Sequence, residues 1–203
     1  MASAITFRPF MTSDFEPLAR LSQSLWYRMG TPEVCAAAAA ADLAGYLAEA
    51  SYRIVAEKDG TLVGATLCGM SGNEPSDAAT WRKRQKKLRV ATGTNPGDGG
   101  VTQAEERLTA EYLESGRPET DAVIKLLALD PATQGQGAGG RMLEMDRTYL
   151  RSLGARGYFL LTDDDCDYSF YDHKGLARAA THALATRGGA NGRFNVYIYS
   201  ERF

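Results

Sequence analysis

Apolar positions recur at helical spacing near the start of the chain. Leu18, Leu21 and Leu25 follow Ser13-Asp-Phe-Glu16, a capping-box pattern that predicts a helix beginning at Ser13. The run 5–10 before it is short and has the residue types of a strand. The chain is therefore expected to open with a strand and a helix.

The next segment changes from a helical to a β-type pattern. Thr31-Pro32-Glu33 predicts a second helix start, with proline at the first helical position, and an alanine-rich run follows it. Residues 52–57 and 61–70 are β-type runs joined by Lys58-Asp59-Gly60, and Asp-Gly is a strong hairpin signal. The order so far is strand, helix, helix, hairpin.

The second half of the chain contains two nearly continuous apolar runs, 121–129 and 158–162, which are typical of buried strands. Two further strands are expected over 176–186 and 194–200, with turn chemistry between them at 187–192. A short helix is expected over 169–174. A longer helix should follow the first apolar run, with Gly154 as its C-cap. Its inward face is expected to consist of Met142, Met145, Tyr149 and Leu153.

Residues 71–120 differ in composition from the rest of the chain. They contain a basic run at 82–89, a glycine-rich stretch at 92–100, and a capping box at Thr102-Gln-Ala-Glu105 that predicts a helix. Large apolar residues are too few here for a separate core, so a helical insertion is expected. The whole pattern predicts a single α/β domain over residues 1–203, with a mixed, mostly antiparallel sheet and flanking helices.

Composition narrows the class of protein. An apolar fraction of 44% and a charged fraction of 24% in 203 residues are typical of a soluble globule and exclude a mostly disordered chain. The net charge of −2 argues against wholesale binding to nucleic acid or a membrane surface. Cys35, Cys68 and Cys166 form no CxxC pair, which favours a reducing cytosol over a disulfide framework or a zinc site. Because the N-terminus lacks a signal-peptide pattern, a cytoplasmic location is expected.

The most informative segment is the glycine-rich run 134–140, Gln-Gly-Gln-Gly-Ala-Gly-Gly, between a buried strand and a helix. Glycines let the backbone approach a ligand, and a helix N-terminus offers N–H groups and a positive dipole end, so the run predicts a pyrophosphate site. Gly135, Gly137 and Gly140 satisfy GxGxxG, and Asp163 ends the next strand where a dinucleotide-binding acid would lie. Two lengths argue against a nicotinamide site. In the dinucleotide-binding fold the strand runs directly into the first glycine, whereas five residues separate them here. About forty residues follow Asp163, which are too few for the second half of that fold.

A second phosphate-binding family fits this run better. Gln134-x-x-Gly137-x-Gly139, after Leu127-Ala128-Leu129-Asp130-Pro131, resembles the acyl-CoA-binding motif of the GNAT superfamily of N-acetyltransferases. The segment 170–176, FYDHKGL, is similar to the family's FYxxxGF segment, and the order of predicted elements is also the family's. The resemblance covers most of the chain and leaves 71–120 unmatched.

The resemblance implies an acetyl-CoA site without a metal. The backbone of 134–140 would hold the CoA pyrophosphate, and the backbone of 127–129 would pair with the pantetheine arm. Asp164 stands where many relatives carry an asparagine that contacts this arm, although a carboxylate cannot donate as an amide does. The implied cofactor-binding residues are Leu127, Ala128, Leu129, Gln134, Gly135, Gln136, Gly137, Ala138, Gly139, Gly140 and Asp164.

The resemblance also implies direct attack of a primary amine on the thioester, with Tyr171 as the general acid for the departing thiolate. A phenol with a pKa near 10 suits this role, since a carboxylic acid would already be ionised. The alternative is that Tyr171 is simply a packed aromatic. The central strand lacks the glutamate that often serves as base, and Asp163 is the candidate base or water holder. The acceptor is expected to be a small-molecule or peptide amine.

Several alternatives stay open. A nicotinamide-dependent oxidoreductase and a non-catalytic CoA-sensing module are the rival functions, and the missing glutamate favours the latter. Cys166 with His173 suggests a thiol hydrolase, although no nucleophile motif surrounds Cys166. The aspartates around 163–167 suggest a cation site, although they lack the spacing of a calcium loop, and His182 is expected to be structural. Three interpretations of the basic run 82–89 stay open. It forms a solvated helix face that pairs with the acidic helix after Glu105, it contacts the CoA 3′-phosphate, or it binds an anionic acceptor. The C-terminal strands are candidate homodimer elements.

Overall fold

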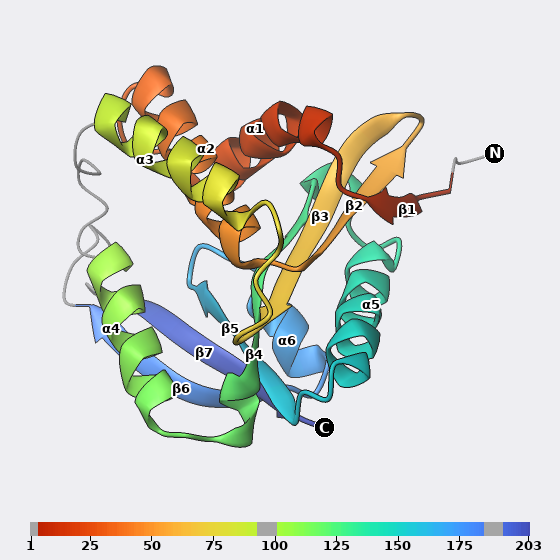
Figure 1. Cartoon of the computed structure of the whole chain (residues 1–203), viewed down its shortest axis with the longest axis vertical. Helices are drawn as coiled ribbons and strands as arrows, with labels where there is room; N and C mark the ends of the chain where they lie inside the picture. Colours follow the sequence, from red (N-terminus) through yellow and green to blue (C-terminus); the bar gives the residue numbers. More distant parts are fainter. Residues whose placement is uncertain (1–3, 93–100, 185–192) are drawn as a thin grey trace. The chain divides into compact units, whose positions relative to one another are not determined.

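The computed structural model describes residues 4–92, 101–184 and 193–203, which form strands and helices in the predicted order (Figure 1). The glycine-rich stretch expected at 92–100 lies outside the described residues apart from Thr92, and the turn at 187–192 lies outside them entirely. The strands are β1 (Thr6–Pro9), β2 (Tyr52–Lys58), β3 (Thr61–Met70), β4 (Ala122–Leu129), β5 (Gly157–Asp163), β6 (Ala177–Leu184) and β7 (Phe194–Arg202). The α-helices are α1 (Phe15–Trp26), α2 (Pro32–Glu49), α3 (Ala78–Thr92), α4 (Val101–Glu114), α5 (Ala138–Ser152) and α6 (Ser169–His173). Three short 3₁₀ helices are η1 (Thr12–Asp14), η2 (Pro118–Asp121) and η3 (Pro131–Thr133).

Hydrogen bonds join the strands in the order β1-β2-β3-β4-β5-β7-β6. β4 pairs parallel to β5, while β1–β2, β2–β3, β5–β7 and β7–β6 pair antiparallel. The predicted fold class, a mixed and mostly antiparallel sheet with flanking helices, is confirmed.

Contacts divide the chain into two compact units. The first comprises the described residues within Met1–Pro96 and Lys125–Tyr149, and the second those within Gly97–Ile124 and Leu150–Phe203. The boundary passes through β4 and falls within the segment expected to be an insertion. Its two helices therefore belong to different units, α3 to the first and α4 to the second.

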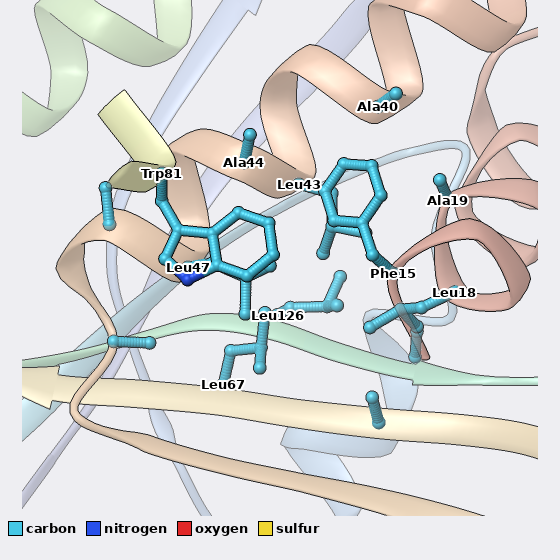
Figure 2. Packing of buried hydrophobic residues seen from close by; sticks show 14 of the residues in the cluster. Phe15, Leu18, Ala19, Ala40, Leu43, Ala44, Leu47, Leu67, Trp81 and Leu126 are labelled. Atoms are coloured by element: carbon cyan, nitrogen blue, oxygen red, sulfur yellow. The ribbon is translucent and has the colours of Figure 1, made fainter. Parts of the chain in front are cut away.

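The core of the first unit lies between α1, α2 and α3 and one face of its strands (Figure 2). Trp81 of α3 is 4% exposed, and its ring stacks on Phe15 of α1 with 5.3 Å between centroids. Both rings lie over Leu67 of β3 and Leu126 of β4 in Figure 2. Gly45 of α2 allows α3 to approach closely, because a Cβ at this position would lie 2.3 Å from the side-chain nitrogen of Gln85 in α3. The segment carrying α3 is thus part of this core.

The opposite face of the same strands is covered by α5 (Figure 1). Ala138 and Met142 of α5 pack with Ala56 of β2 and Val63 of β3. Neighbouring residues Val55 and Ala56 belong to opposite clusters, because successive side chains in a strand point to opposite faces. This arrangement places the start of α5 against buried strands.

The second unit has its own core on the strands β5 and β7. Leu108 and Tyr112 of α4 pack with Phe159 of β5 and with Val196 and Ile198 of β7. The helix predicted after this capping box is confirmed, with α4 described from Val101 on, and the capping-box contacts of Thr102 and Glu105 stay a prediction.

The predicted start of the first helix at Ser13 is wrong. The chain enters a 3₁₀ turn at Thr12, and α1 begins only at Phe15. The backbone N–H of Met11 donates to the Asp14 carboxylate at 2.6 Å. Arg8 donates two hydrogen bonds to the same carboxylate. Glu16, the acid expected in this role, pairs instead with Arg84 at 2.7 Å. Arg8 decides between the two acids, because it makes Asp14 a paired rather than an isolated charge.

The basic run 82–89 on α3 is largely exposed. Its arginines form ion pairs with carboxylates of the first unit, namely Arg82–Glu74, Arg84–Glu16 and Arg89–Asp42.

In the described part of the chain, none of the helices is sufficiently long and apolar to cross a membrane.

Arg53 anchors α2, β2 and the turn before α3. Its guanidinium donates to the carbonyls of Leu47 and Ala50 and forms two hydrogen bonds with the Asp77 carboxylate, of 2.6 and 2.8 Å. Arg53 holds the pKa of Asp77 below its usual value, and the Trp81 indole donates to the same carboxylate. Four hydrogen bonds thus depend on one side chain that is only 15% exposed.

Replacing Arg53 by Ala is expected to lower the free energy of unfolding by about 2–3 kcal/mol, because charged hydrogen bonds at a half-buried site are lost. Urea unfolding followed by circular dichroism measures the change. Arg82→Ala is the matched control: both side chains of its pair with Glu74 are exposed, so its loss should change the free energy of unfolding very little. Equal losses for the two variants would contradict the anchoring role.

Candidate functional site

The glycine-rich run 134–140 lies in the first unit, between β4 and α5. A fixed turn precedes it: the Asp130 carboxylate accepts a hydrogen bond from the Ala132 N–H, and the Thr133 hydroxyl donates to the Asp130 carbonyl, both at 2.8 Å. The Asp130 N–H donates to the Val63 carbonyl of β3 at 2.7 Å. The residues that separate the strand from the glycines are therefore tied to the sheet.

Gly135 and Gly137 adopt left-handed backbone conformations, with φ of +76° and +77°. Side chains are strained there, which explains glycine at both positions. A Cβ built at either would meet no atom of the described residues within 4 Å, so there is room for a ligand beside the backbone. α5 begins directly afterwards at Ala138, and the first N–H groups of a helix have no partner within it. Open space, backbone donors and a positive dipole end together fit a pyrophosphate group.

Two cationic side chains lie next to this run. Lys58 at the end of β2 donates to the Gln136 side-chain oxygen at 3.4 Å. Arg141, in the first turn of α5, holds its guanidinium 4.9 Å from the centre of the Phe7 ring. Both charges add to the positive potential at the helix N-terminus, which favours anions.

The predicted cofactor-binding residues of β4 belong to the same unit as the glycine run. Leu127 and Leu129 pack in one cluster with Ala138 and Met142 of α5, while Ala128 packs on the opposite face. The structure therefore places 127–129 and 134–140 in the same unit, and their binding of CoA stays a prediction.

Tyr171 lies on α6 in the second unit, where the predicted short helix is confirmed. It is 9% exposed, and its ring packs against Phe170 and Tyr199 with centroid separations of 5.2 and 5.5 Å. The Leu176 N–H donates to the Tyr171 carbonyl at 3.1 Å. Ring packing and the following turn together fix the position of Tyr171 within this unit.

Sequence reasoning missed a hydrogen-bonded network next to Tyr171. Arg178 of β6 donates to the Tyr199 hydroxyl at 2.9 Å and to the Asp172 carboxylate at 3.0 Å. The Tyr199 hydroxyl donates to the same carboxylate at 2.8 Å. Burial raises the pKa of Tyr199, and the hydrogen bond to Asp172 raises it further. The sequence contains no local pattern that indicates this network, because only the register of β6 on β7 sets Arg178 opposite Tyr199.

The same guanidinium lies over three tyrosine rings. Its carbon is 5.3 Å from the ring centre of Tyr168, 4.7 Å from that of Tyr197 and 5.4 Å from that of Tyr199. Such cation–π contacts add to the hydrogen bonds that hold Arg178. The residues around α6 thus form one polar and aromatic network within the second unit.

Asp163 and Asp164, at the end of β5, are both hydrogen-bonded in the second unit. Asp163 accepts from the Asp165 N–H at 2.9 Å, as in an Asx turn. The Asp164 carboxylate accepts from the backbone and side-chain N–H groups of Asn195 and from the Tyr197 hydroxyl. Burial, and next the hydrogen bond to Asp164, raise the pKa of Tyr197 to about 12. The catalytic role of Asp163 and the CoA contact of Asp164 stay predictions.

The alternative chemistries receive little support from the described residues. Burial raises the pKa of the Cys166 thiol to about 12, so it stays protonated at neutral pH, whereas a nucleophilic cysteine needs its thiolate. His182 of β6 accepts a hydrogen bond from Arg107 of α4 at 2.7 Å. In the part of the chain that the structure describes, no group of three or more His, Cys, Asp or Glu side chains is placed to hold a metal ion.

No protein-family model and no curated protein sequence matches the chain. Solved structures do match it. The polyamine N-acetyltransferase of Drosophila melanogaster, which forms N-acetylagmatine, is 16% identical with a TM-score of 0.61, over 98% of this chain and 100% of that one. The ribosomal-protein-S18-alanine N-acetyltransferase of Escherichia coli is 13% identical with a TM-score of 0.59, over 98% and 94%. A GNAT-family protein of Desulfovibrio desulfuricans is 18% identical with a TM-score of 0.58, over 98% and 99%.

These matches extend over 98% of this chain. The chain therefore has the fold of the GNAT acetyltransferases, and the resemblance is confirmed at the level of the fold. Activity is a separate question, because one fold carries many functions and the site residues decide among them.

Proposed function

We propose that this protein is an N-acetyltransferase that moves an acetyl group from acetyl-CoA to a primary amine of a small molecule or peptide. The observation that carries the proposal is the glycine run before α5, with two left-handed glycines, open space beside them and a helix N-terminus. The GNAT fold of the whole chain supports the same function. A nicotinamide site is less well supported, because the fixed turn at 130–134 separates β4 from the glycines.

Different segments of the proposed site bind different parts of acetyl-CoA. Backbone N–H groups of 134–140 bind the pyrophosphate, and the dipole of α5 stabilises its charge. Lys58 and Arg141 supply further positive charge beside the run. The backbone of 127–129 holds the pantetheine arm by hydrogen bonds.

The reacting residues move protons. Bound acetyl-CoA supplies the acetyl group as a thioester. Tyr171 holds a proton on its hydroxyl for the leaving sulfur, because a phenol, with an ordinary pKa near 10, stays protonated at neutral pH. Asp163 takes the proton from the attacking amine, directly or through a water molecule. β4 carries no glutamate for this purpose, so Asp163 is the carboxylate proposed for it.

Thermal unfolding with acetyl-CoA, free CoA, NAD(H) and NADP(H) tests the donor. A ligand at 100 times its dissociation constant adds about 2.7 kcal/mol, which should raise the midpoint by roughly 5–10 °C for a chain of this length. We expect a shift with acetyl-CoA and CoA only. A shift with a nicotinamide cofactor instead would overturn the proposal.

A panel of primary amines then tests the transfer itself, with release of the CoA thiol as the readout. We expect thiol release to depend on both the amine and the protein. A protein that binds CoA but releases no thiol with any amine would instead be a non-catalytic CoA-binding module.

A further inference from the structure

A carboxyl group that has no charged partner among the described residues lies buried in the first unit. Asp146 is on α5, about two turns after Ala138, and its exposed fraction is 0%. It faces β3, where the Thr66 hydroxyl lies 2.5 Å from its Oδ2 atom. Among the described residues it has no ion pair, and its Oδ1 atom accepts no hydrogen bond from them. Burial of a carboxylate in such a place costs far more free energy than burial of the neutral acid.

The hydrogen bonds of Thr66 indicate which form is present. The Thr66 oxygen lies within reach of two acceptors, the Asp146 carboxyl and the Leu126 carbonyl of β4 at 3.2 Å. A hydroxyl has a single proton, so it can serve only one of them if Asp146 is ionised. If Asp146 is protonated, its O–H donates to Thr66 and Thr66 donates to Leu126, and both contacts are satisfied. The geometry therefore fits the neutral acid.

The titratable groups that interact with Asp146 among the described residues are uncharged as well. They include the Cys68 thiol of β3 and the Tyr52 phenol of β2, and the Tyr52 ring stacks on Tyr149 of α5 at 4.4 Å. Burial raises the pKa of Asp146 to about 7, and hydrogen bonds from Thr66 and Cys68 offset only part of this shift. Burial also raises the pKa of Cys68 and of Tyr52. The whole pocket favours the uncharged carboxyl.

We propose that Asp146 is a positioning residue that is held as the neutral acid, and that its proton, through Thr66, ties α5 to the Leu126 carbonyl of β4. The proposal rests on the function proposed above in one respect: α5 starts at the glycine run and Leu126 directly precedes 127–129, so this tie joins both parts of the CoA-binding backbone. Release of the proton to solvent leaves a buried charge, and the Thr66 hydroxyl then donates to the carboxylate instead of to the Leu126 carbonyl. Alkaline pH should then loosen the tie and weaken CoA binding.

The sign of the stability effect follows from the two pKa values. Unfolded, the carboxyl has its usual value of 3.8; folded, the value is about 7. Between these values the folded protein holds a proton that the unfolded chain has released, so stability falls as pH rises from about 4 to about 7 and stays low above. Asp146→Asn keeps a donor toward Thr66 and cannot ionise, so it should remove this part of the pH dependence.

Thermal unfolding of the wild type, Asp146→Asn and Asp59→Asn between pH 5 and 8 tests the neutral acid. Asp59 is an exposed carboxyl in the β2–β3 turn and controls for the loss of one negative charge. We expect the midpoint of the wild type to fall by about 5 °C or more relative to Asp146→Asn over this range, with Asp59→Asn following the wild type. Parallel profiles for wild type and Asp146→Asn would overturn the proposal. Thr66→Ser, which keeps the hydroxyl, should retain the wild-type profile if Asp146→Asn folds poorly.

Calorimetric titration of the same proteins with CoA at pH 5.5 and pH 8 tests the positioning. We expect the dissociation constant of the wild type to rise between the two pH values by about fivefold or more relative to that of Asp146→Asn. Equal rises in the two proteins would overturn the positioning role. Absence of CoA binding at either pH would instead contradict the proposed function, and the unfolding profiles would still decide whether Asp146 ties α5 to β3 and β4.

Discussion

Replacement of Tyr171 by Phe is expected to lower kcat at least about tenfold while the affinity for acetyl-CoA stays nearly unchanged. The substitution removes only the hydroxyl that holds the proton for the leaving sulfur. The ring, which packs against Phe170 and Tyr199, is retained, so the second unit should keep its stability. Steady-state release of the CoA thiol gives kcat, and calorimetric titration gives the affinity.

Tyr168→Phe is the matched control for this variant. Tyr168 immediately precedes α6, and its ring packs against Tyr197 at 5.0 Å, so its Phe variant also loses a hydroxyl and keeps a ring contact. We expect its turnover to stay within about twofold of the wild type, because it takes no part in proton transfer. If Tyr171→Phe behaved in the same way, Tyr171 would be a packing residue and the acid would have to be sought elsewhere.

Replacement of Gly137 by Val should abolish the stabilisation of the protein by CoA. The residue has a φ of +77°, where a β-branched side chain is strained by about 1–3 kcal/mol, and the added methyl groups would occupy the open space beside the backbone. Both effects turn the N–H groups of the run away from the pyrophosphate or block its approach. Thermal unfolding with and without saturating CoA measures the loss.

Gly154→Val separates backbone strain from loss of the ligand site. Gly154 follows the C-terminal end of α5 with a φ of +81°, and a Cβ there also meets no atom of the described residues within 4 Å. The two variants should therefore lose similar stability without ligand, while only Gly154→Val keeps the midpoint shift with CoA. A full CoA shift in Gly137→Val would show that the glycine run is not the phosphate site.

Local patterns predicted the elements well where the local rule was strong. Thr31 caps α2 by accepting from the Val34 N–H, and Pro32 occupies the first helical position as expected. The hairpin turn at Asp59 and Gly60 has a positive φ at both residues, which is why Asp-Gly indicated it. Gly154 also has a positive φ, so the predicted C-cap of α5 is confirmed.

The inward face of α5 was predicted correctly at Met142 and incorrectly at the other three positions. The expected face was Met142, Met145, Tyr149 and Leu153, whereas the fully buried side chains on the helix are Met142, Leu143, Asp146 and Leu150. The buried face is rotated because Tyr149 stays half-buried at the edge, where it stacks on Tyr52 and donates to the Ser51 hydroxyl. A periodicity argument also assigns an aspartate to solvent, since buried carboxyl groups are rare.

The sequence by itself determined the order of strands and helices, the glycine run and the short helix that carries Tyr171. These features depend on residues close together in the chain, through backbone conformations and side-chain periods that local chemistry dictates. Only the tertiary structure decided that Asp146 faces Thr66, that Arg178 lies beside Tyr199, and that Arg53 binds Asp77. Each of these contacts joins separate elements, and helix rotation and strand register set them through the packing of the whole unit.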